Sequence, residues 1–421
     1  MSQVRDPGIL VVISDSANGP QLVQCAELLL GKRDGFIHVV RSAARHSFNN
    51  IGAFSRNAPY LRYAAREHIF HYPPRKDVVQ FANGLARTAR LGTLVTDWID
   101  PVEEFQPILK MAVDMGLSAV FLRSGTQIHV RRMLIPMHGG PHTLQQLWVA
   151  KELASSMGAS TLALRIVTPA DQGGNDIEPG YIDAAGELAR LESRIIGMNG
   201  PVALSAADDV VSGIAARRTA EDMLVIGAPN YWRAAEHFES STPYLIAQRF
   251  PNPLAMLLAR RPTRVQLRDV FWEDNVRLRL ASSNKNDVIT CLLDTLVQHN
   301  QIPESARGAL LTVAMEREAE LSTAVGCDTA FPHIAVEGFP GVIGCLGICP
   351  QGMDWGSPIR DGDSETTRFV FLLISSSDYY GDLLAVMAKI ARLMVLPGVR
   401  KDLLACSSAK AALSILDGNE N

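Results

Sequence analysis

The stretch TAFPHIAVEGFPGVIG, residues 329–344, places one histidine, His333, directly after a proline and before a strand-like apolar run. Proline restricts the backbone ahead of the histidine, so the imidazole can be held in a turn and aimed outward. Sixteen residues upstream, the helical segment VAMEREAELS contains Arg317. The surrounding pattern predicts helices at residues 285–300 and 305–321, then the His333 segment, two strands and a long helix over residues 382–396.

These features resemble the enzyme IIA domain of the bacterial phosphotransferase system, of the fructose, mannitol and nitrogen-regulatory type. The resemblance covers residues 284–416. It implies phosphoryl transfer, with His333 as the phosphoacceptor and Arg317 as the residue that stabilises the phosphoryl group. In many relatives a second histidine opens the long helix, whereas the matching helix here starts GDLLAVMAKIARLM, with Asp382 and Leu383.

Phosphoryl transfer through histidine needs a neutral ring nitrogen in line with the phosphorus and donors for the three equatorial oxygens. Arg317 offers a forked, permanently charged donor. Gly326 and the polar run after it, residues 327–329, are expected to supply backbone N–H groups around the oxygens. The alternative stays open that His333 is a turn histidine without chemistry and Arg317 a surface arginine of a helix.

Length and composition describe an ordinary globular chain. With 421 residues, 47% apolar and 20% charged, the sequence suggests about three domains. A net charge of -4 gives no reason to expect nucleic acid as a partner. Six cysteines without a CxxC pair indicate reduced thiols and a cytoplasmic location. Apolar runs fall short of the roughly 18–20 residues of a membrane helix, and GILVVIS near the start is interpreted as a first strand, not a signal peptide.

The first two thirds of the chain alternate short apolar strands with amphipathic helices, and the plan repeats. Leu22, Cys25, Leu28 and Leu29 lie on one face of the first helix. Such alternation predicts an α/β fold with parallel sheets of Rossmann-like type. We expect two tandem domains, residues 1–126 and 130–262, a linker at 263–283 and a C-terminal α/β domain at 284–421. Residues 42–87 are too weakly patterned to place.

Both repeats resemble universal stress protein domains, the first being diverged like the stress-protein-like halves in cytosolic tails of transporters. The resemblance implies that the copies pair through their last strands as a pseudo-dimer within the chain. An unpaired edge in each copy would be a liability.

The nucleotide site of such domains has an aspartate after the first strand and a glycine-rich phosphate loop. Here the loop reads GAPNYWRAAEHFESSTP: Gly227 is kept, Asn230 and Ser240 stand at two glycine positions, Ser241 follows, and His138 occupies the aspartate position. These five are weak candidates for binding ATP or another nucleotide. Loss of nucleotide binding is the favoured interpretation, and no cofactor is expected.

Other patterns in the sequence give weaker evidence of a functional site. His138 and His142 share a turn without the three or four converging ligands that a metal needs, so no metal is expected. Cys345, Cys349 and Trp355 are interpreted as packing residues.

The sequence therefore predicts a cytosolic regulatory protein that takes a phosphoryl group on His333 from a histidine phosphocarrier protein and relays this state to a partner. The expected partner is a membrane transporter, which would hold the chain at the inner face of the membrane; a homodimer is a further alternative. Whether the chain is an enzyme is left open. The rival hypothesis is a non-enzymatic nucleotide-sensing or docking module for a transporter, in which His333 is not phosphorylated.

Overall fold

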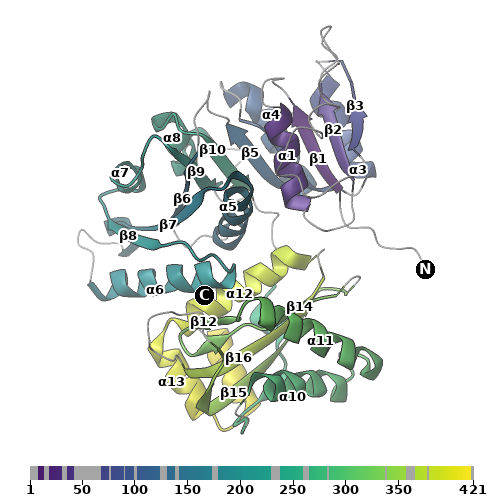
Figure 1. Cartoon of the computed structure of the whole chain (residues 1–421), viewed down its shortest axis with the longest axis vertical. Coiled ribbons are helices and arrows are strands. Elements are labelled where there is room, and N and C mark those ends of the chain that lie inside the picture. Colours follow the sequence, from purple (N-terminus) through teal and green to yellow (C-terminus); the bar gives the residue numbers. More distant parts are fainter. Residues whose placement is uncertain are drawn as a thin grey trace. The chain divides into compact units, whose positions relative to one another are not determined.

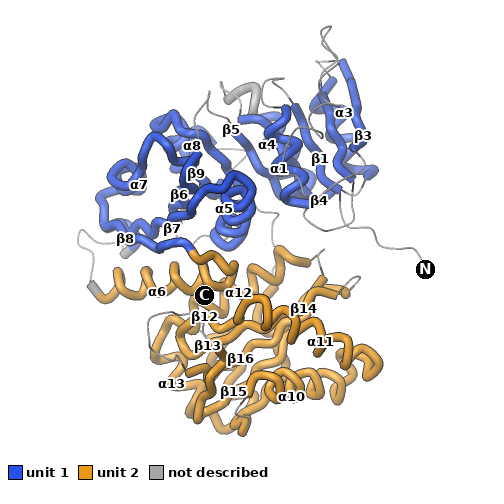
Figure 2. Tube along the Cα trace, in the orientation of Figure 1, with its two compact units in different colours: residues 1–178, 200–261 blue, residues 179–199, 262–421 orange. Residues whose placement is uncertain are grey.

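A computed structural model of the chain describes residues 8–13, 19–30, 36–41, 68–74, 77–89, 91–98, 102–123, 130–137, 142–172, 179–228, 238–258, 265–281, 284–336, 339–356, 366–376 and 379–418. The chain divides into two compact units (Figure 2). Unit 1 comprises residues 1–178 and 200–261, and unit 2 comprises residues 179–199 and 262–421. In the part of the chain that is described, no helix is long and apolar enough to cross a membrane.

Unit 1 is built on a ten-stranded sheet with the strand order β3-β2-β1-β4-β5-β10-β9-β6-β7-β8 (Figure 1). The strands of the first half are β1 (Gly8–Ile13), β2 (Ile37–Arg41), β3 (His68–His71), β4 (Leu91–Asp97) and β5 (Ser118–Arg123). Those of the second half are β6 (Arg132–Met137), β7 (Ser160–Val167), β8 (Val202–Ala206), β9 (Asp222–Gly227) and β10 (Leu254–Leu258). Neighbours within each half run parallel, which confirms the predicted fold class.

The helices of unit 1 are α1 (Gly19–Leu30), α3 (Val78–Thr88), α4 (Val102–Met115), α5 (Thr143–Met157), α7 (Val210–Ala215) and α8 (Thr242–Arg249), with short 3-10 turns at Pro169–Gln172 and Phe238–Ser240. The first strand, GILVVI, is buried at every position, as expected of a parallel strand covered on both faces. On α1, Leu22, Cys25 and Leu29 are buried as predicted, but Leu28 is only half-buried. Gly158 ends α5 with a φ of 65°, a conformation that glycine adopts without steric cost.

The two halves of unit 1 join through their last strands, which confirms the predicted pairing. Strand β10 runs antiparallel to β5, with Leu254 opposite Arg123 and Leu258 opposite Ala119. The Arg123 guanidinium also donates to the carbonyl oxygens of Ala247 at 2.6 Å and Phe250 at 2.5 Å, so it caps the end of α8 from the other half. One apolar core runs through both halves.

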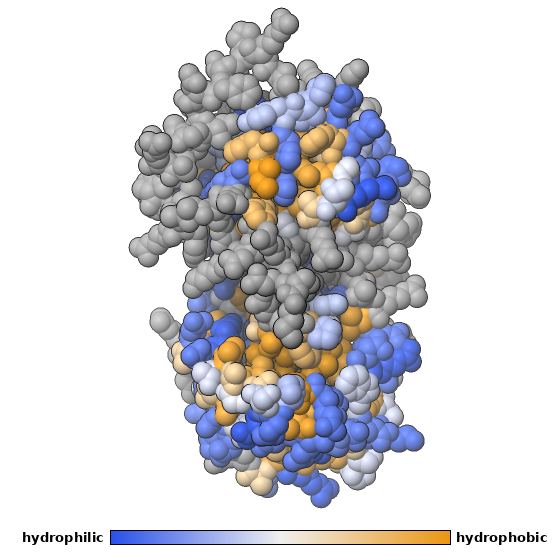
Figure 3. Space-filling view, turned by 90° about the vertical axis from the view of Figure 1, so that its right-hand side faces the viewer, coloured by the Kyte–Doolittle hydropathy of each residue, from blue (hydrophilic) through white to orange (hydrophobic). Residues whose placement is uncertain are grey.

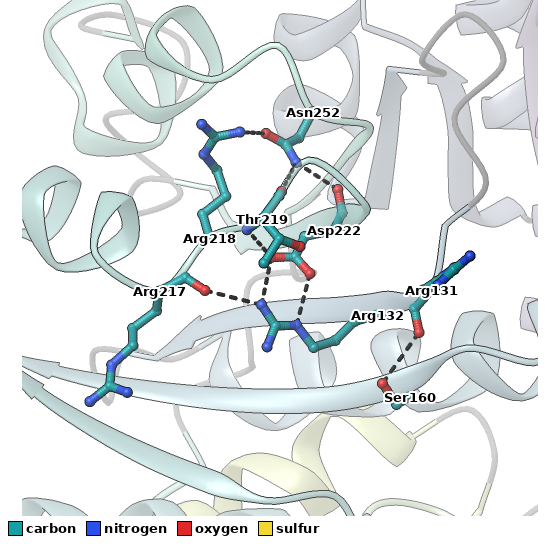
Figure 4. Close-up of polar contacts among 8 residues, drawn as sticks. All are labelled: Arg131, Arg132, Ser160, Arg217, Arg218, Thr219, Asp222 and Asn252. Carbon is teal, nitrogen blue, oxygen red and sulfur yellow. Dashed lines mark hydrogen bonds and ion pairs between the residues drawn. The ribbon is translucent and has the colours of Figure 1, made fainter.

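A buried ion pair fixes the start of β6 against the start of β9 (Figure 4). Asp222 is fully buried and accepts from Arg132 Nε and Nη2, both at 2.8 Å, and from the Thr219 N–H at 2.7 Å. Asn252 Nδ2 donates to the carbonyl oxygens of Thr219 at 2.9 Å and Asp222 at 2.8 Å. Because a buried carboxylate is costly unless it is paired and hydrogen-bonded, this network is a structural element of unit 1.

Unit 2 contains a six-stranded sheet with the order β11-β15-β16-β13-β12, and β14 pairs with β16. Its strands are β11 (Val276–Arg277), β12 (Ala324–Gly326), β13 (Thr329–Ala330), β14 (His333–Ala335), β15 (Val342–Asp354) and β16 (Thr366–Ser375). Its helices are α6 (Pro179–Ile195), α9 (Leu267–Val270), α10 (Lys285–Gln298), α11 (Glu304–Glu320), α12 (Tyr380–Met394), α13 (Pro397–Ala405) and α14 (Ala409–Gly418), with a 3-10 turn at Glu273–Asn275. Helices α10 and α11 share one core with one face of this sheet.

Figure 3 looks at the side of unit 2 on which α11 and β14 lie in Figure 1. Apolar residues gather in the middle of the visible face of that unit, and polar residues surround them.

Within the segment expected as a linker, α9 and β11 are ordered against the sheet, because Leu267 and Val270 are buried and Val276 pairs with Leu346. The domain boundaries proposed from sequence otherwise stay predictions.

Helix α6 lies between β7 and β8 along the chain but packs in unit 2 (Figure 2). It contacts β12, the edge strand of the second sheet, and α12. Arg194 Nη1 donates to the Val325 carbonyl oxygen at 2.9 Å, and the Cys327 thiol donates to Glu187 Oε1 at 3.0 Å. Covering an edge strand removes a row of unpaired backbone groups. Helix α6 is therefore a structural part of unit 2.

Candidate functional site

Strand β14 places His333 beside the central strand of unit 2. His333 pairs with Leu373 of β16, and the Leu373 N–H donates to the Pro332 carbonyl oxygen at 2.9 Å. The side chain is half-buried, and its Nδ1 lies 2.9 Å from the Phe331 carbonyl oxygen. A carbonyl oxygen only accepts, so Nδ1 carries the proton and Nε2 keeps its lone pair. The ring is thereby held in the tautomer whose free nitrogen is Nε2.

Arg317 lies in the last turn of α11 and is brought to the same end of the sheet. Its Nη1 donates to the Leu321 carbonyl oxygen at 3.3 Å. The chain then turns back beside the His333 segment, since the Phe331 N–H donates to the Thr323 carbonyl oxygen at 3.0 Å. Arg317 and His333 interact electrostatically across this loop.

The pKa of His333 lies below its usual range. Burial is the main cause, because it disfavours the imidazolium, and the Arg317 charge lowers the pKa further. The hydrogen bond to the Phe331 carbonyl acts in the opposite direction. The neutral form of His333, which is the form that can attack a phosphorus atom, is thus favoured at neutral pH.

Glu318, the residue after Arg317, is a buried carboxylate that fixes the end of α11. It accepts from Trp355 Nε1 at 3.1 Å and from the Thr323 N–H at 3.3 Å, and Lys285 Nζ lies 3.7 Å from the same oxygen. Trp355 is buried as expected for packing and also makes this hydrogen bond. Sequence reasoning missed Glu318; the signal was a buried indole, which needs an acceptor for its N–H.

The expectation that residues 326–329 surround the phosphoryl group is wrong. Gly326 ends β12, and Cys327 and Asp328 form the tight turn between β12 and β13, with φ values of 105°, 52° and 57° for the three residues. Thr329 pairs with Phe369, whereas His333 pairs with the residue four positions further along the same strand. Four residues of parallel strand span about 13 Å.

Asp328 instead holds the turn onto the rest of unit 2. Its carboxylate pairs with Arg368 at 2.7 Å and with Arg400 at 3.7 Å. Its carbonyl oxygen accepts the N–H groups of Arg368 at 2.7 Å and Phe369 at 2.9 Å. These bonds stabilise a backbone conformation that non-glycine residues adopt at a cost.

The exposure of the first residues of α12 distinguishes Asp382 from Leu383, the two residues at the start of the long helix. Asp382 is half-buried in the first turn, whereas Leu383 is 2% exposed and belongs to the core. Of Asp382 and Leu383, Asp382 is therefore the one whose side chain reaches the surface at the start of this helix.

In unit 1, Gly227 lies at the end of β9, where a nucleotide would approach the sheet. A Cβ placed on Gly227 would lie 3.2 Å from the Cβ of His142, so the close neighbour of this glycine is a side chain of α5's first turn. Gln146, one turn later, is also turned inward and donates to the carbonyl oxygens of Pro136 at 2.8 Å and Val225 at 2.6 Å.

The structure describes two of the other four nucleotide-site candidates, Ser240 and Ser241. Ser241 is the N-cap of α8: its hydroxyl accepts from the Tyr244 N–H at 3.4 Å and donates to the Phe238 carbonyl oxygen at 2.6 Å. Ser240 is exposed. His138 and Asn230 lie outside the described residues. The structure thus brings Ser241 into helix capping.

Among the described residues, no group of three or more histidine, cysteine or acidic side chains could hold a metal ion. Cys345 and Cys349 are buried, and burial raises the pKa of both thiols, that of Cys349 to about 11. Both are therefore packing residues, as predicted.

Comparison with known families gives a match in the C-terminal part of the chain. Residues 269–419 match the family described as "Phosphoenolpyruvate-dependent sugar phosphotransferase system, EIIA 2". The C-terminal part of the chain is an EIIA type 2 domain. The printed description of this family names a phosphoenolpyruvate-dependent sugar phosphotransferase system. The resemblance inferred from the His333 segment is thereby confirmed.

One similar protein is the PTS system fructose-specific EIIABC component of Bacillus subtilis, 20% identical over 156 residues, which are 37% of this chain and 24% of that protein. The chain thus spans about a quarter of that relative's length. Among solved structures, the nitrogen regulatory protein IIA-Ntr of Neisseria meningitidis is 19% identical, with 36% of this chain and 98% of that chain covered and a TM-score of 0.32. A universal stress protein from Archaeoglobus fulgidus is 11% identical, with 60% of this chain and 96% of that chain covered and a TM-score of 0.36.

Proposed function

We propose that the EIIA domain accepts a phosphoryl group on Nε2 of His333 from a histidine phosphocarrier protein, and that the chain relays this state to a partner. The hydrogen bond between His333 Nδ1 and the Phe331 carbonyl carries the proposal, because it leaves Nε2 as the free nucleophile. Arg317, whose charge reaches His333, is the donor for the phosphoryl oxygens.

The transfer is balanced without an added proton donor. The phosphocarrier arrives as a phosphoimidazolium; its P–N bond breaks, and its ring leaves as neutral imidazole. The new P–N bond forms at Nε2 of His333, which becomes a phosphoimidazolium that keeps its Nδ1 proton on the Phe331 carbonyl. Arg317 offsets the charge on the equatorial oxygens during the step.

The relay is proposed to run through α6. This helix packs against β12 and α12 of the EIIA domain and is joined by the chain to β7 and β8 of unit 1. Its bonds from Arg194 and to Glu187 end on Val325 and Cys327, next to the strand that leads to His333. The partner that reads the state is proposed to be a membrane transporter, which would bring the chain to the inner face of the membrane.

A second candidate is a docking or nucleotide-sensing module in which His333 is never phosphorylated. The start of α12 favours it, because Asp382 and buried Leu383 stand where many relatives have a second histidine. Nucleotide sensing would require ATP to bind beside Gly227 despite the contact with His142.

Both candidates are separated by one experiment on the full chain. Wild type and His333→Ala are incubated with a phosphorylated histidine phosphocarrier, and intact mass is followed over time. The proposal predicts a gain of one phosphoryl group by the wild type, lost on acid treatment, and no gain by His333→Ala. An unchanged wild-type mass, with micromolar ATP binding by calorimetry, would instead support the sensing module.

A further inference from the structure

Two serine hydroxyls are buried without a partner where β16 ends. Ser375 is 1% exposed and Ser376 2% exposed, and neither hydroxyl oxygen has a hydrogen-bond partner in the described part of the chain. A buried hydroxyl without a partner destabilises the folded state, because it has lost its hydrogen bonds to water. Buried polar groups are nearly always satisfied, so each of these hydroxyls is a candidate for a ligand that is present in another state of the protein, and its place relative to His333 distinguishes the two.

Ser375 lies on the same side of the sheet as His333. It pairs with Ala335, two positions after His333 on β14, and its carbonyl oxygen accepts the Val336 N–H at 2.7 Å. Side chains of paired residues share a face, and faces alternate along a strand. Ile334 and Ile374, the intervening pair, point into the core shared with α10 and α11, so His333 and Ser375 both lie on the opposite face.

The distance suits a group carried on the imidazole. One strand spacing across the sheet and two residues along it put the Cα atoms of His333 and Ser375 about 8 Å apart. The imidazole spans much of this distance, and its Nδ1 is turned to the Phe331 carbonyl, behind His333 along the chain. A phosphoryl group on the free Nε2 would extend the reach of this side chain further, which is compatible with a contact to Ser375.

The end of β16 leads into the N-terminus of α12, a 15-residue helix. Its N-cap residue, Tyr379, makes no side-chain capping hydrogen bond. First-turn N–H groups of a helix have no partner within the helix, and the helix dipole favours an anion there. The N-terminus of α12 thus lies close to the end of β16, where the Tyr379 N–H donates to the Ser376 carbonyl oxygen at 3.0 Å.

We propose that Ser375 is a phosphoryl-binding residue of the EIIA domain. Its Oγ–H donates to an equatorial oxygen of the phosphoryl group on Nε2 of His333, with the first-turn N–H groups of α12 as further donors. No bond other than the P–N bond changes, since the serine keeps its proton. This inference rests on the proposed phosphorylation of His333.

The test compares Ser375→Ala with Ser376→Ala, the matched control at the neighbouring buried hydroxyl. Phosphoryl uptake from a phosphorylated histidine phosphocarrier and the half-life of the product are measured by intact mass on the full chain. Ser375→Ala is expected to lower kcat for uptake about tenfold to hundredfold with KM for the phosphocarrier unchanged, since one donor to the transition state is lost. Ser375→Thr, which keeps the hydroxyl, should restore most of the rate, and Ser376→Ala should match the wild type.

Thermal unfolding separates this role from a structural one. The Ser375 hydroxyl has no partner to lose in the unphosphorylated chain, so Ser375→Ala should leave Tm unchanged or raise it. A Ser375→Ala rate equal to wild type, or an equal loss in Ser376→Ala, would overturn the role of Ser375 and leave phosphorylation of His333 standing. Absence of phosphoryl uptake by the wild type would overturn both.

Discussion

Replacing Arg317 with alanine tests the electrostatics of the site. The Arg317 guanidinium is held by the Leu321 carbonyl and lowers the pKa of His333. Removing one preorganised donor from a transition state costs about 2–4 kcal/mol. Because about 1.4 kcal/mol is a factor of ten in rate, uptake by Arg317→Ala should fall about 30- to 700-fold. Arg317→Lys should recover only part of this loss, since an ammonium lacks the forked geometry.

The same substitution makes a second, independent prediction. The Arg317 charge disfavours the imidazolium of His333, so the pKa of His333 should rise toward its usual value in Arg317→Ala. The stability cost should stay near that of one hydrogen bond, about 1 kcal/mol. The rate is followed by rapid quench and intact mass, and the pKa by NMR titration of the imidazole nitrogens.

Arg307→Ala is the matched control for this experiment. Arg307 is on the same helix, α11, and its ion pair is with Asp294 of α10. Its uptake rate and the pKa of His333 should remain those of the wild type. If Arg317→Ala changed neither quantity, or if Arg307→Ala changed both equally, the assignment of Arg317 to the site would be refuted.

Three further predictions concern stability and the second histidine. Asp222→Ala should lower the unfolding free energy by about 3 kcal/mol, because Arg132 loses its buried partner. Arg131→Ala, the control, removes an exposed ion pair with 3.4 Å between its atoms and should cost under about 1 kcal/mol. Urea unfolding measures both free energies. Asp382→His should speed phosphoryl uptake, whereas Leu383→His should mainly destabilise the fold, by about 2 kcal/mol or more, because Leu383 is in the core. Quench-flow measures the uptake rate and thermal unfolding the stability. A Leu383→His variant that is faster and fully stable would contradict this placement. The pKa of His333 is lower in the folded chain than in the unfolded chain, so the unfolded chain takes up the proton at a higher pH. Stability should therefore fall as pH drops through about 6.5. His333→Gln should flatten this part of the profile of stability against pH, and an unchanged profile would argue against the lowered pKa.

Local pattern was enough to predict the alternation of strands and helices, including strands β5 and β10. The buried apolar runs of these strands are strong local signals, and the stress-protein resemblance supplied the pairing. Local pattern failed to predict β3 and most of α3, which lie in the segment 42–87. Strand β3 is the edge strand of the ten-stranded sheet and is only half-buried. An edge strand carries a weak apolar pattern, because one side has no neighbour to pack against.

The roles of His333 and Arg317 stay predictions, and the surroundings of these residues could not be predicted from the sequence. His333 and Arg317 are marked by residue type and spacing, but whether residues 326–329 face the histidine depends on strand register, which the sequence does not specify. The network of Glu318, Trp355 and Lys285 joins three distant segments, so no local pattern announces it. The packing of α6 in unit 2 likewise depends on tertiary contacts.

The central claim is that the EIIA domain is phosphorylated on Nε2 of His333. The most direct measurement is NMR of the full chain, with 15N-labelled histidine, after incubation with a phosphorylated histidine phosphocarrier, reading the coupling between 31P and the imidazole nitrogens. The hydrogen bond from Nδ1 to the Phe331 carbonyl predicts coupling to Nε2 of one histidine, absent in His333→Ala. Coupling to Nδ1, coupling that survives in His333→Ala, or no phosphorus on any histidine would contradict the account.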